Sequence, residues 1–263
     1  MDGATSEVRS NLLTLNTTVC FAFQWAMLFL PAGQCLCPIH AGKKSGLPDV
    51  IFNEELLAPI SFISYGIASV KSPYLQKQNH LIRDNLQADN PIRIRVDDFT
   101  QYAATGSYFA FDLMGVKAKH NLKSRLFVAS VAHIIMGSTV NLMKKSVPIL
   151  RPDFSASNSF PSGHTATAFV GAELIWQEYR HQSIWYGVGA YTVAVGTGFF
   201  RMYNNRHWLS DVVMGAGIGV LSTKMAYWML PRLEERLQKR KNPFLLMPSY
   251  NGKQFMLSFA ANH

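Results

Sequence analysis

Six apolar or helix-like stretches follow one another along the chain and restrict the folds that it can adopt. They lie at residues 56–70, 99–116, 124–143, 165–176, 183–200 and 212–230. Some of the last four approach the length that crosses a bilayer. With 48% hydrophobic residues and a mean hydropathy of +0.05, composition alone does not separate a soluble from a membrane-embedded protein. We predict an all-α fold, a helical bundle with little sheet, embedded in a membrane or associated with one.

The first 41 residues are expected to be a signal peptide or an N-terminal anchor. The apolar run at 19–30 has the size of a signal-peptide core rather than of a full membrane span. All three cysteines, Cys20, Cys35 and Cys37, lie in or just after this run. Export is therefore expected, and no disulfide framework can be argued.

The rest of the chain divides by polarity into three segments. Residues 42–96 are predicted to be helical at first and then polar from 71 onward, with the polar part external. Residues 97–232 hold the predicted core. Residues 233–263 form a basic tail, in which Asn251-Gly252 lies between two apolar runs, as in a hairpin turn.

The chain is basic, with a formal net charge of +9, which suits anionic partners. Its basic runs are short. The run at 239–241 follows a long apolar helix, a position typical of a membrane-surface anchor. We therefore expect a membrane as a partner, and no nucleic acid.

Two cations follow the stretch at 124–143. Lys144 precedes Arg151 by seven residues, and Pro148 and Pro152 allow the segment between them to turn back. A guanidinium offers a bidentate fork and an ammonium a point charge, so this pair can neutralise part of a phosphate dianion. Lysines after an apolar helix are also common as membrane-interface anchors, so the pair by itself leaves both interpretations open.

A second cluster, Pro161-Ser162-Gly163-His164, stands before the helix expected to begin near Thr165. The free backbone amides and the dipole of that helix then point at an anion in the turn. Ser162 adds a hydroxyl donor, Gly163 permits close backbone approach, and His164 can protonate a leaving oxygen. The alternative is an N-cap followed by a buried histidine.

The third cluster is Arg201 with His207 and Asp211. The histidine and the aspartate are four residues apart on a predicted helix, so they are expected on one face. A carboxylate bound to one ring nitrogen fixes the tautomer and leaves the other nitrogen free to attack. Arg201 supplies a third cation for the oxygens of a phosphoryl transition state.

Together these clusters resemble the signature of the type 2 phosphatidic acid phosphatase superfamily. That pattern is Lys, six residues, Arg-Pro; then Pro-Ser-Gly-His; then Ser-Arg, five residues, His, three residues, Asp. The chain matches it between Lys144 and Asp211, except at Phe200, where many members have Ser. A looser similarity in helix pattern extends from about 97 to 230.

The resemblance implies a bundle of about six helices, with 97–232 as the phosphatase catalytic core. It also implies hydrolysis through a phosphohistidine intermediate, without a metal or another cofactor. Carried onto this chain, His207 is the nucleophile, Asp211 its orienting partner and His164 the general acid. The residues expected to bind phosphate are Lys144, Arg151, Ser162, Gly163 and Arg201.

The expected substrate is a lipid phosphate, a monoester or a pyrophosphate, at the outer face of a bacterial inner membrane, with the site facing the periplasm. Lipid A, undecaprenyl pyrophosphate and phosphatidylglycerol phosphate all fit, with lipid A first by resemblance to exported bacterial members. The alternatives are a soluble periplasmic acid phosphatase of broad specificity, a vanadium-dependent haloperoxidase, and a lipid-binding scaffold without turnover. His133 and His181 are assigned no role.

Overall fold

The computed structural model of the protein describes residues 54–88, 93, 95–240, 245–250 and 255–260. The predicted signal peptide or anchor at 1–41 lies outside these residues. Apart from Glu54, the first residue of α2, the helices below belong to one compact unit, Glu55–His263. The described helices are α2 (Glu54–Lys71), α3 (Pro73–Gln87), α4 (Asp97–Leu113), α5 (Leu122–Ser146), α6 (Gly163–Tyr179), α7 (Ile184–Tyr203) and α8 (Leu209–Arg240).

The predicted all-α bundle is confirmed, and its seven described helices are close to the expected six. Two strands, β1 (Leu245–Tyr250) and β2 (Phe255–Ala260), pair antiparallel on either side of Asn251-Gly252. Their pairing agrees with the hairpin that the sequence suggested. The turn itself lies outside the described residues.

The helices differ from the expected stretches in two places. The polar region after residue 71 contains α3, which begins with Pro73 after an extended Ser72, a favourable start for a helix. Helix α8 continues through the exposed Pro231 to Arg240, well past the expected end at 230. The expected core boundary at 232 therefore falls inside a helix.

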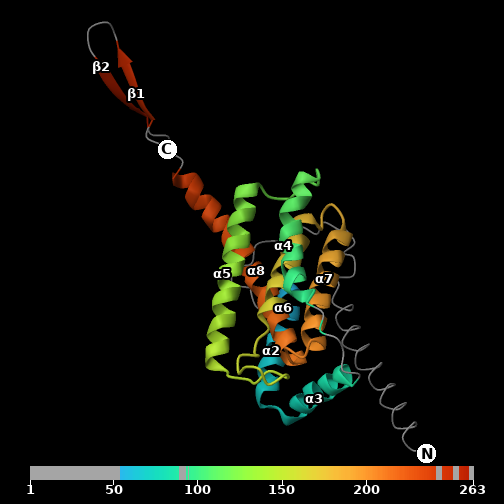
Figure 1. The fold of residues 1–263 in the computed structure, drawn as a ribbon. Coiled ribbons are helices and arrows are strands. Elements are labelled where there is room, and N and C mark those ends of the chain that lie inside the picture. The colour runs from blue at the N-terminus through green and yellow to red at the C-terminus, as the bar shows by residue number, and fades with distance from the viewer. Residues whose placement is uncertain (1–53, 89–92, 94, 241–244, 251–254, 261–263) are drawn as a thin grey trace, which may run out of the picture. The chain divides into compact units, whose positions relative to one another are not determined.

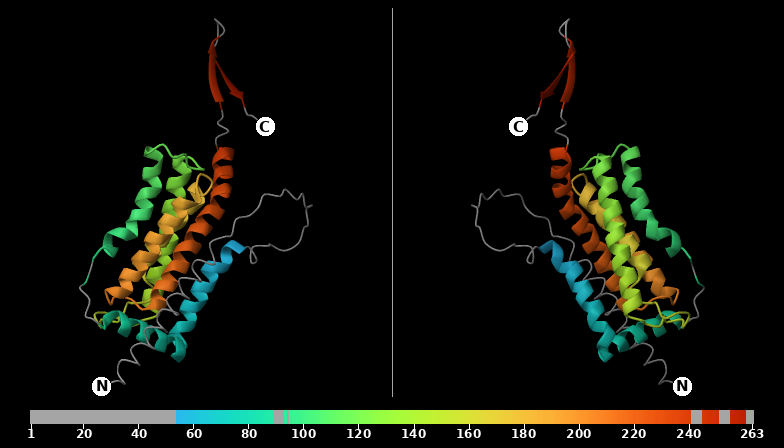
Figure 2. Two further views of the ribbon diagram at one scale, coloured as in Figure 1. Left: turned by 90° about the vertical axis from the view of Figure 1, so that its right-hand side faces the viewer. Right: turned by 90° about the vertical axis from the view of Figure 1, so that its left-hand side faces the viewer.

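Helices α4 to α8 run alternately in opposite directions, and α3 lies across one end of them (Figures 1 and 2). At that end α5 and α7 finish, while α4, α6 and α8 begin. The short connections from α4 to α5, from α6 to α7 and from α7 to α8 favour this alternation, whereas a longer loop, 147–162, joins α5 to α6. As a result, residues more than 100 positions apart in the sequence meet at one end of the bundle.

Helix α6 lies at the centre of the bundle and packs against α4, α5, α7 and α8. Most of its length is buried, with small residues such as Ala166, Ala168 and Ala172 fully enclosed. Helix α8 approaches it through two glycines. A Cβ atom at Gly215 would lie 2.5 Å from the Ser162 carbonyl oxygen.

Helices pack closely at some glycines and not at others. Gly215 and Gly219 share a face of α8, and that face lies against α6. Gly187 and Gly198 also contact neighbouring helices closely. Gly189 and Gly196, by contrast, have no neighbouring atom within 4 Å of a Cβ position, so packing does not require a glycine there.

Within the described part of the chain, α5 is the one helix that is long and apolar enough to cross a membrane. An 18-residue window of it has a mean hydropathy of 1.7, and only 28% of that window is buried. Leu126, Ile134 and Leu142 on this helix are each about half exposed or more, at 49%, 65% and 67%. Apolar surface of this extent is typical of contact with lipid or with a partner.

We expect Gly219→Ala to destabilise the bundle by about 1–3 kcal/mol, because the new methyl group would overpack the α6–α8 contact. The Cβ would lie 2.5 Å from the Ala166 carbonyl oxygen and 2.9 Å from the Phe169 Cβ. Thermal unfolding of the purified protein in detergent measures the change.

The matched control is Gly189→Ala, at an exposed position of α7 with no neighbouring atom within 4 Å of the new Cβ. It should leave stability unchanged or raise it by about 0.5–1 kcal/mol through helix propensity. Equal shifts for the two variants would show that the α6–α8 contact is not tightly packed.

Candidate active site

The predicted site residues gather at the end of the bundle where helices begin and finish. Lys144 and Arg201 lie in the last turns of α5 and α7. Gly163 opens α6, and Asp211 lies in the first turn of α8. The positive ends of two helix dipoles and two cationic side chains therefore face one region, which favours the binding of an anion.

His207 and Asp211 are in contact, but not in the way their spacing predicted. The prediction of a shared helix was wrong, because α8 begins only at Leu209 and His207 lies in the preceding loop. The Nδ1 atom of His207 is 3.4 Å from Oδ2 of Asp211. The same oxygen accepts a hydrogen bond of 2.9 Å from the Trp208 amide, so Asp211 also caps the start of its helix.

A third residue, Ser159, contacts both His207 and Asp211, and it was not identified from the sequence. Its hydroxyl donates to Oδ2 of Asp211 and lies 3.5 Å from Nδ1 of His207. The Ser162 amide donates to the backbone oxygen of Asp211 at 3.0 Å. Because 52 residues separate Ser159 from Asp211, no local pattern could have predicted the contact.

Burial determines the charge state of His207. The residue is only 3% exposed. Burial lowers the pKa of His207 to about 4, with a smaller contribution from the charges of Arg201 and Lys144 and opposition from Asp211. The imidazole is therefore neutral at neutral pH, and in the described part of the chain its Nε2 atom makes no hydrogen bond.

The three predicted cations lie near one another and near His207. Lys144, Arg151 and Arg201 are close enough for their charges to repel one another. The Lys144 ammonium donates to the Asn158 carbonyl oxygen at 2.8 Å. Arg151 and Arg201 each keep a buried Nε–H without a hydrogen-bond partner among the described residues. Arg206, which sequence reasoning missed, adds a fourth charge that acts on Arg151.

Two acidic residues at the start of α4 were also missed. Asp97 pairs with Arg201 at 2.5 Å and accepts a hydrogen bond from Asn204 at 2.9 Å. Asp98 lies 3.2 Å from Nε2 of His164 and 3.7 Å from Arg201. The sequence pattern that could have pointed to them is the acidic pair itself, which stands directly before the helix-like stretch at 99–116. These carboxylates hold the side chains of Arg201 and His164 in place.

Ser162 takes the position that the N-cap alternative described. It is fully buried, and its oxygen bonds to the Thr165 amide at 3.4 Å and to the Thr165 hydroxyl at 2.9 Å. A hydroxyl used in this way is less available to a ligand, whereas the amides of Gly163 and His164, the first two of α6, have no acceptor within their own helix. Phe200, the departure from the family pattern, packs its ring against Phe199 and Tyr203.

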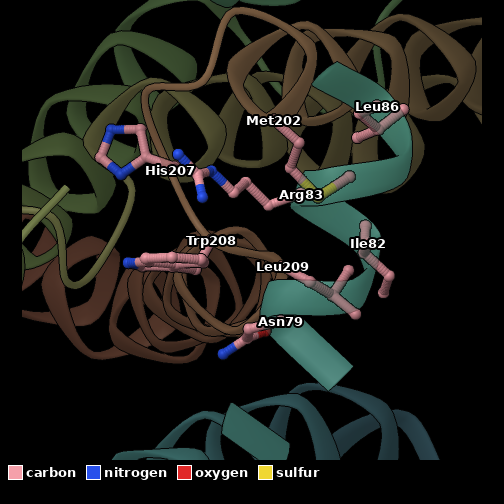
Figure 3. Close-up of a pocket in the computed structure, with 8 residues that line it drawn as sticks. All are labelled: Asn79, Ile82, Arg83, Leu86, Met202, His207, Trp208 and Leu209. Carbon is pink, nitrogen blue, oxygen red and sulfur yellow. The ribbon is translucent and has the colours of Figure 1, made fainter. Parts of the chain in front are cut away.

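A narrow crevice borders His207 on the side of α3 (Figure 3). Asn79 and Arg83 of α3 line it opposite His207 and Trp208, and Arg83 extends from its helix toward the histidine (Figure 3). Across the described residues, no three His, Cys, Asp or Glu side chains gather as metal ligands.

Comparison with known proteins identifies the segment that carries the site. Residues 125–235 match the model of the PAP2 superfamily, which confirms the resemblance seen in the motifs. The chain is 41% identical over 136 residues to a lipid A 1-phosphatase of Porphyromonas gingivalis, covering 51% of this chain and 31% of that protein. It is 36% identical over 76 residues to the bacitracin transport permease protein BcrC of Bacillus licheniformis, covering 29% and 36%. The chain thus spans about a third of the length of these relatives.

A solved structure is also similar, that of a transmembrane PAP2 type phosphatidylglycerolphosphate phosphatase from Bacillus subtilis. The TM-score is 0.43 at 18% identity, covering 68% of this chain and 97% of that one.

We expect Ser159→Ala to destabilise the fold by about 1–3 kcal/mol, because it removes a donor from a buried carboxylate. Asp211 is 0% exposed, and its Oδ1 atom already lacks a partner among the described residues. Thermal unfolding measures the effect. Ser157→Ala, an exposed serine of the same loop, is the matched control and should shift the midpoint little. Equal stability of the two variants would contradict the role given to Ser159.

Proposed function

Residues 125–235 match the model of the PAP2 superfamily, and from this premise we propose that the chain hydrolyses a lipid phosphate through a phosphohistidine. The observation that carries the proposal is a neutral, buried His207 held by Asp211 and surrounded by cations. A phosphate in this region would meet the charges of Lys144, Arg151 and Arg201. Such preorganised charges stabilise the transition state of phosphoryl transfer.

In the first step, Nε2 of His207 attacks phosphorus while the bond from phosphorus to the leaving oxygen breaks. His164 gives its proton to that oxygen, which leaves as an alcohol or a phosphate. Asp211 stabilises the positive charge that develops on the imidazole ring. The two buried Nε–H groups of Arg151 and Arg201 are donors available to the phosphoryl oxygens.

In the second step, water attacks the phosphohistidine. His164, now without its proton, takes one from the water, and the bond between phosphorus and Nε2 breaks. Inorganic phosphate leaves, and both histidines return to their starting states. Asp98, 3.2 Å from Nε2 of His164, orients this ring in both steps.

The proposed substrate is a lipid phosphate presented by a bacterial inner membrane, with the site on the periplasmic side. The exposed apolar face of α5 supports a membrane setting. Among the lipids considered, lipid A is favoured, since the relative that is 41% identical over 136 residues is a lipid A 1-phosphatase. Undecaprenyl pyrophosphate and phosphatidylglycerol phosphate are the other members of the panel to be tested.

We expect His207→Ala to abolish phosphate release, and Asp211→Asn to cut kcat at least about 100-fold with little change in KM, because the held tautomer is lost. The measurement is inorganic phosphate released from lipid A, undecaprenyl pyrophosphate, phosphatidylglycerol phosphate, phosphatidic acid and a soluble ester, with chelator present. His181→Ala, at an exposed position, is the control and should match the parental protein.

Each alternative function corresponds to a different outcome of this assay. Release from the soluble ester alone would favour an acid phosphatase. Halide oxidation that requires added vanadate would favour a haloperoxidase, and lipid binding without any release would favour a scaffold. Parental activity in folded His207→Ala protein would overturn the assignment of the nucleophile.

The lowered pKa of His207 predicts where activity falls in acid. Only the neutral imidazole can attack, and a pKa of about 4 keeps it neutral down to that pH. We therefore expect the acid limb of kcat/KM to have its midpoint below pH 6.5, the ordinary pKa of histidine, after correction for ionisation of the substrate phosphate. A midpoint at or above 6.5 would contradict a buried, neutral nucleophile in the free enzyme.

A further inference from the structure

Helix α3 lies outside the residues that match the family, yet one of its faces contacts the loop that carries His207. This loop, residues 204–208, joins α7 to α8, and the segment 203–210 consists of the loop with the adjoining helix ends. Four side chains of α3 make these contacts. Asn79 contacts Ser210, His80 contacts Trp208, Arg83 contacts Asn205, and Gln87 contacts Tyr203. The contacts therefore follow the loop from one end to the other.

Asn79 makes the most enclosed of these contacts. It is 7% exposed, and its Oδ1 atom accepts a hydrogen bond of 3.2 Å from the Ser210 amide. Its Nδ2 atom donates to the Ser210 hydroxyl at 2.9 Å. Ser210 is the second residue of α8, so its amide has no acceptor within its own helix. Asn79 thus caps α8 from another helix, next to Asp211.

Arg83 and Gln87 hold the other half of the loop. Gln87 donates to the Tyr203 carbonyl oxygen at 2.8 Å, at the end of α7. Arg83 donates to Oδ1 of Asn205 at 3.4 Å and to the Pro152 carbonyl oxygen at 3.2 Å. Asn205 has a φ of 58°, a left-handed conformation that needs support from its surroundings. Arg83 therefore links this turn to the loop that follows Arg151.

We propose that α3 positions His207 for attack, and that Asn79 is the positioning residue in this contact. The inference rests on the proposed function. His207 has no helix of its own, and its orientation depends on the start of α8, where Asp211 and Ser210 lie. A displacement of about 1 Å in such a group can reduce a rate by roughly 100-fold without weakening substrate binding.

The test compares Asn79→Ala with Asn85→Ala, the same substitution at an exposed position of the same helix. Asn79→Ala should lower kcat roughly 10- to 100-fold at temperatures well below unfolding, with KM changed less than about twofold. Hydrogen exchange in residues 203–210 should be faster in this variant. Asn85→Ala should match the parental protein in both measurements.

A conservative variant separates positioning from general stability. In Asn79→Asp the carboxylate can accept from both the amide and the hydroxyl of Ser210, so kcat on the neutral plateau should return to within about threefold of the parental value. The added negative charge favours the protonated imidazole and so raises the pKa of His207. The acid limb of the pH profile should therefore move to higher pH.

Each outcome supports or refutes the inference. Parental kcat in Asn79→Ala, a loss confined to KM, or equal losses in the Ala and Asp variants would overturn it. Absence of phosphate release from the parental protein on every substrate would instead refute the proposed function, and with it any catalytic role of α3. The two failures are distinguished by the parental measurement alone.

Discussion

A buried carboxylate has to be compensated by its surroundings, and much of the site is arranged around the carboxylate of Asp211. The residue is completely enclosed. Oδ2 accepts hydrogen bonds from Ser159 and from the Trp208 amide, and faces His207. The positive end of α8 offsets part of the remaining charge. His207 and Trp208 directly precede α8, whereas Ser159 comes from the loop between α5 and α6, so satisfying this group brings that loop to the start of α8.

The close packing of α8 on α6 allows Asp211 to lie next to the start of α6. Gly215 allows the backbone of α8 to lie against the Ser162 carbonyl oxygen, one turn after Asp211. The Ser162 amide then reaches the backbone oxygen of Asp211 at 3.0 Å. A side chain at Gly215 would separate the two helix starts, and with them His207 and the turn that precedes His164. The missing side chain at Gly215 therefore allows the candidate site residues to gather at the end of the bundle.

Sequence periodicity located the helices of the bundle well, because a buried apolar face repeats every three or four residues. It failed for α3, whose polar face is bound by residues more than 100 positions away, such as Ser210 for Asn79. It also failed for Ser159 and Asp97, which have no local pattern of their own. The family pattern singled out His207, Asp211 and the cations by residue type and spacing. Only the tertiary structure showed how they contact Ser159 and Asp97.

The sequence by itself determined the helical class, the approximate ends of most helices, and the residues between Lys144 and Asp211 that match the family pattern. These are local properties, set by apolar spacing and by residue type. Only the tertiary structure decided that His207 precedes its helix, that Asp97 and Asp98 hold Arg201 and His164, and that α3 lies against the segment 203–210. These features arise where helix ends that are distant in sequence come together. No local sequence pattern determines which polar groups will form hydrogen bonds with one another at such a place.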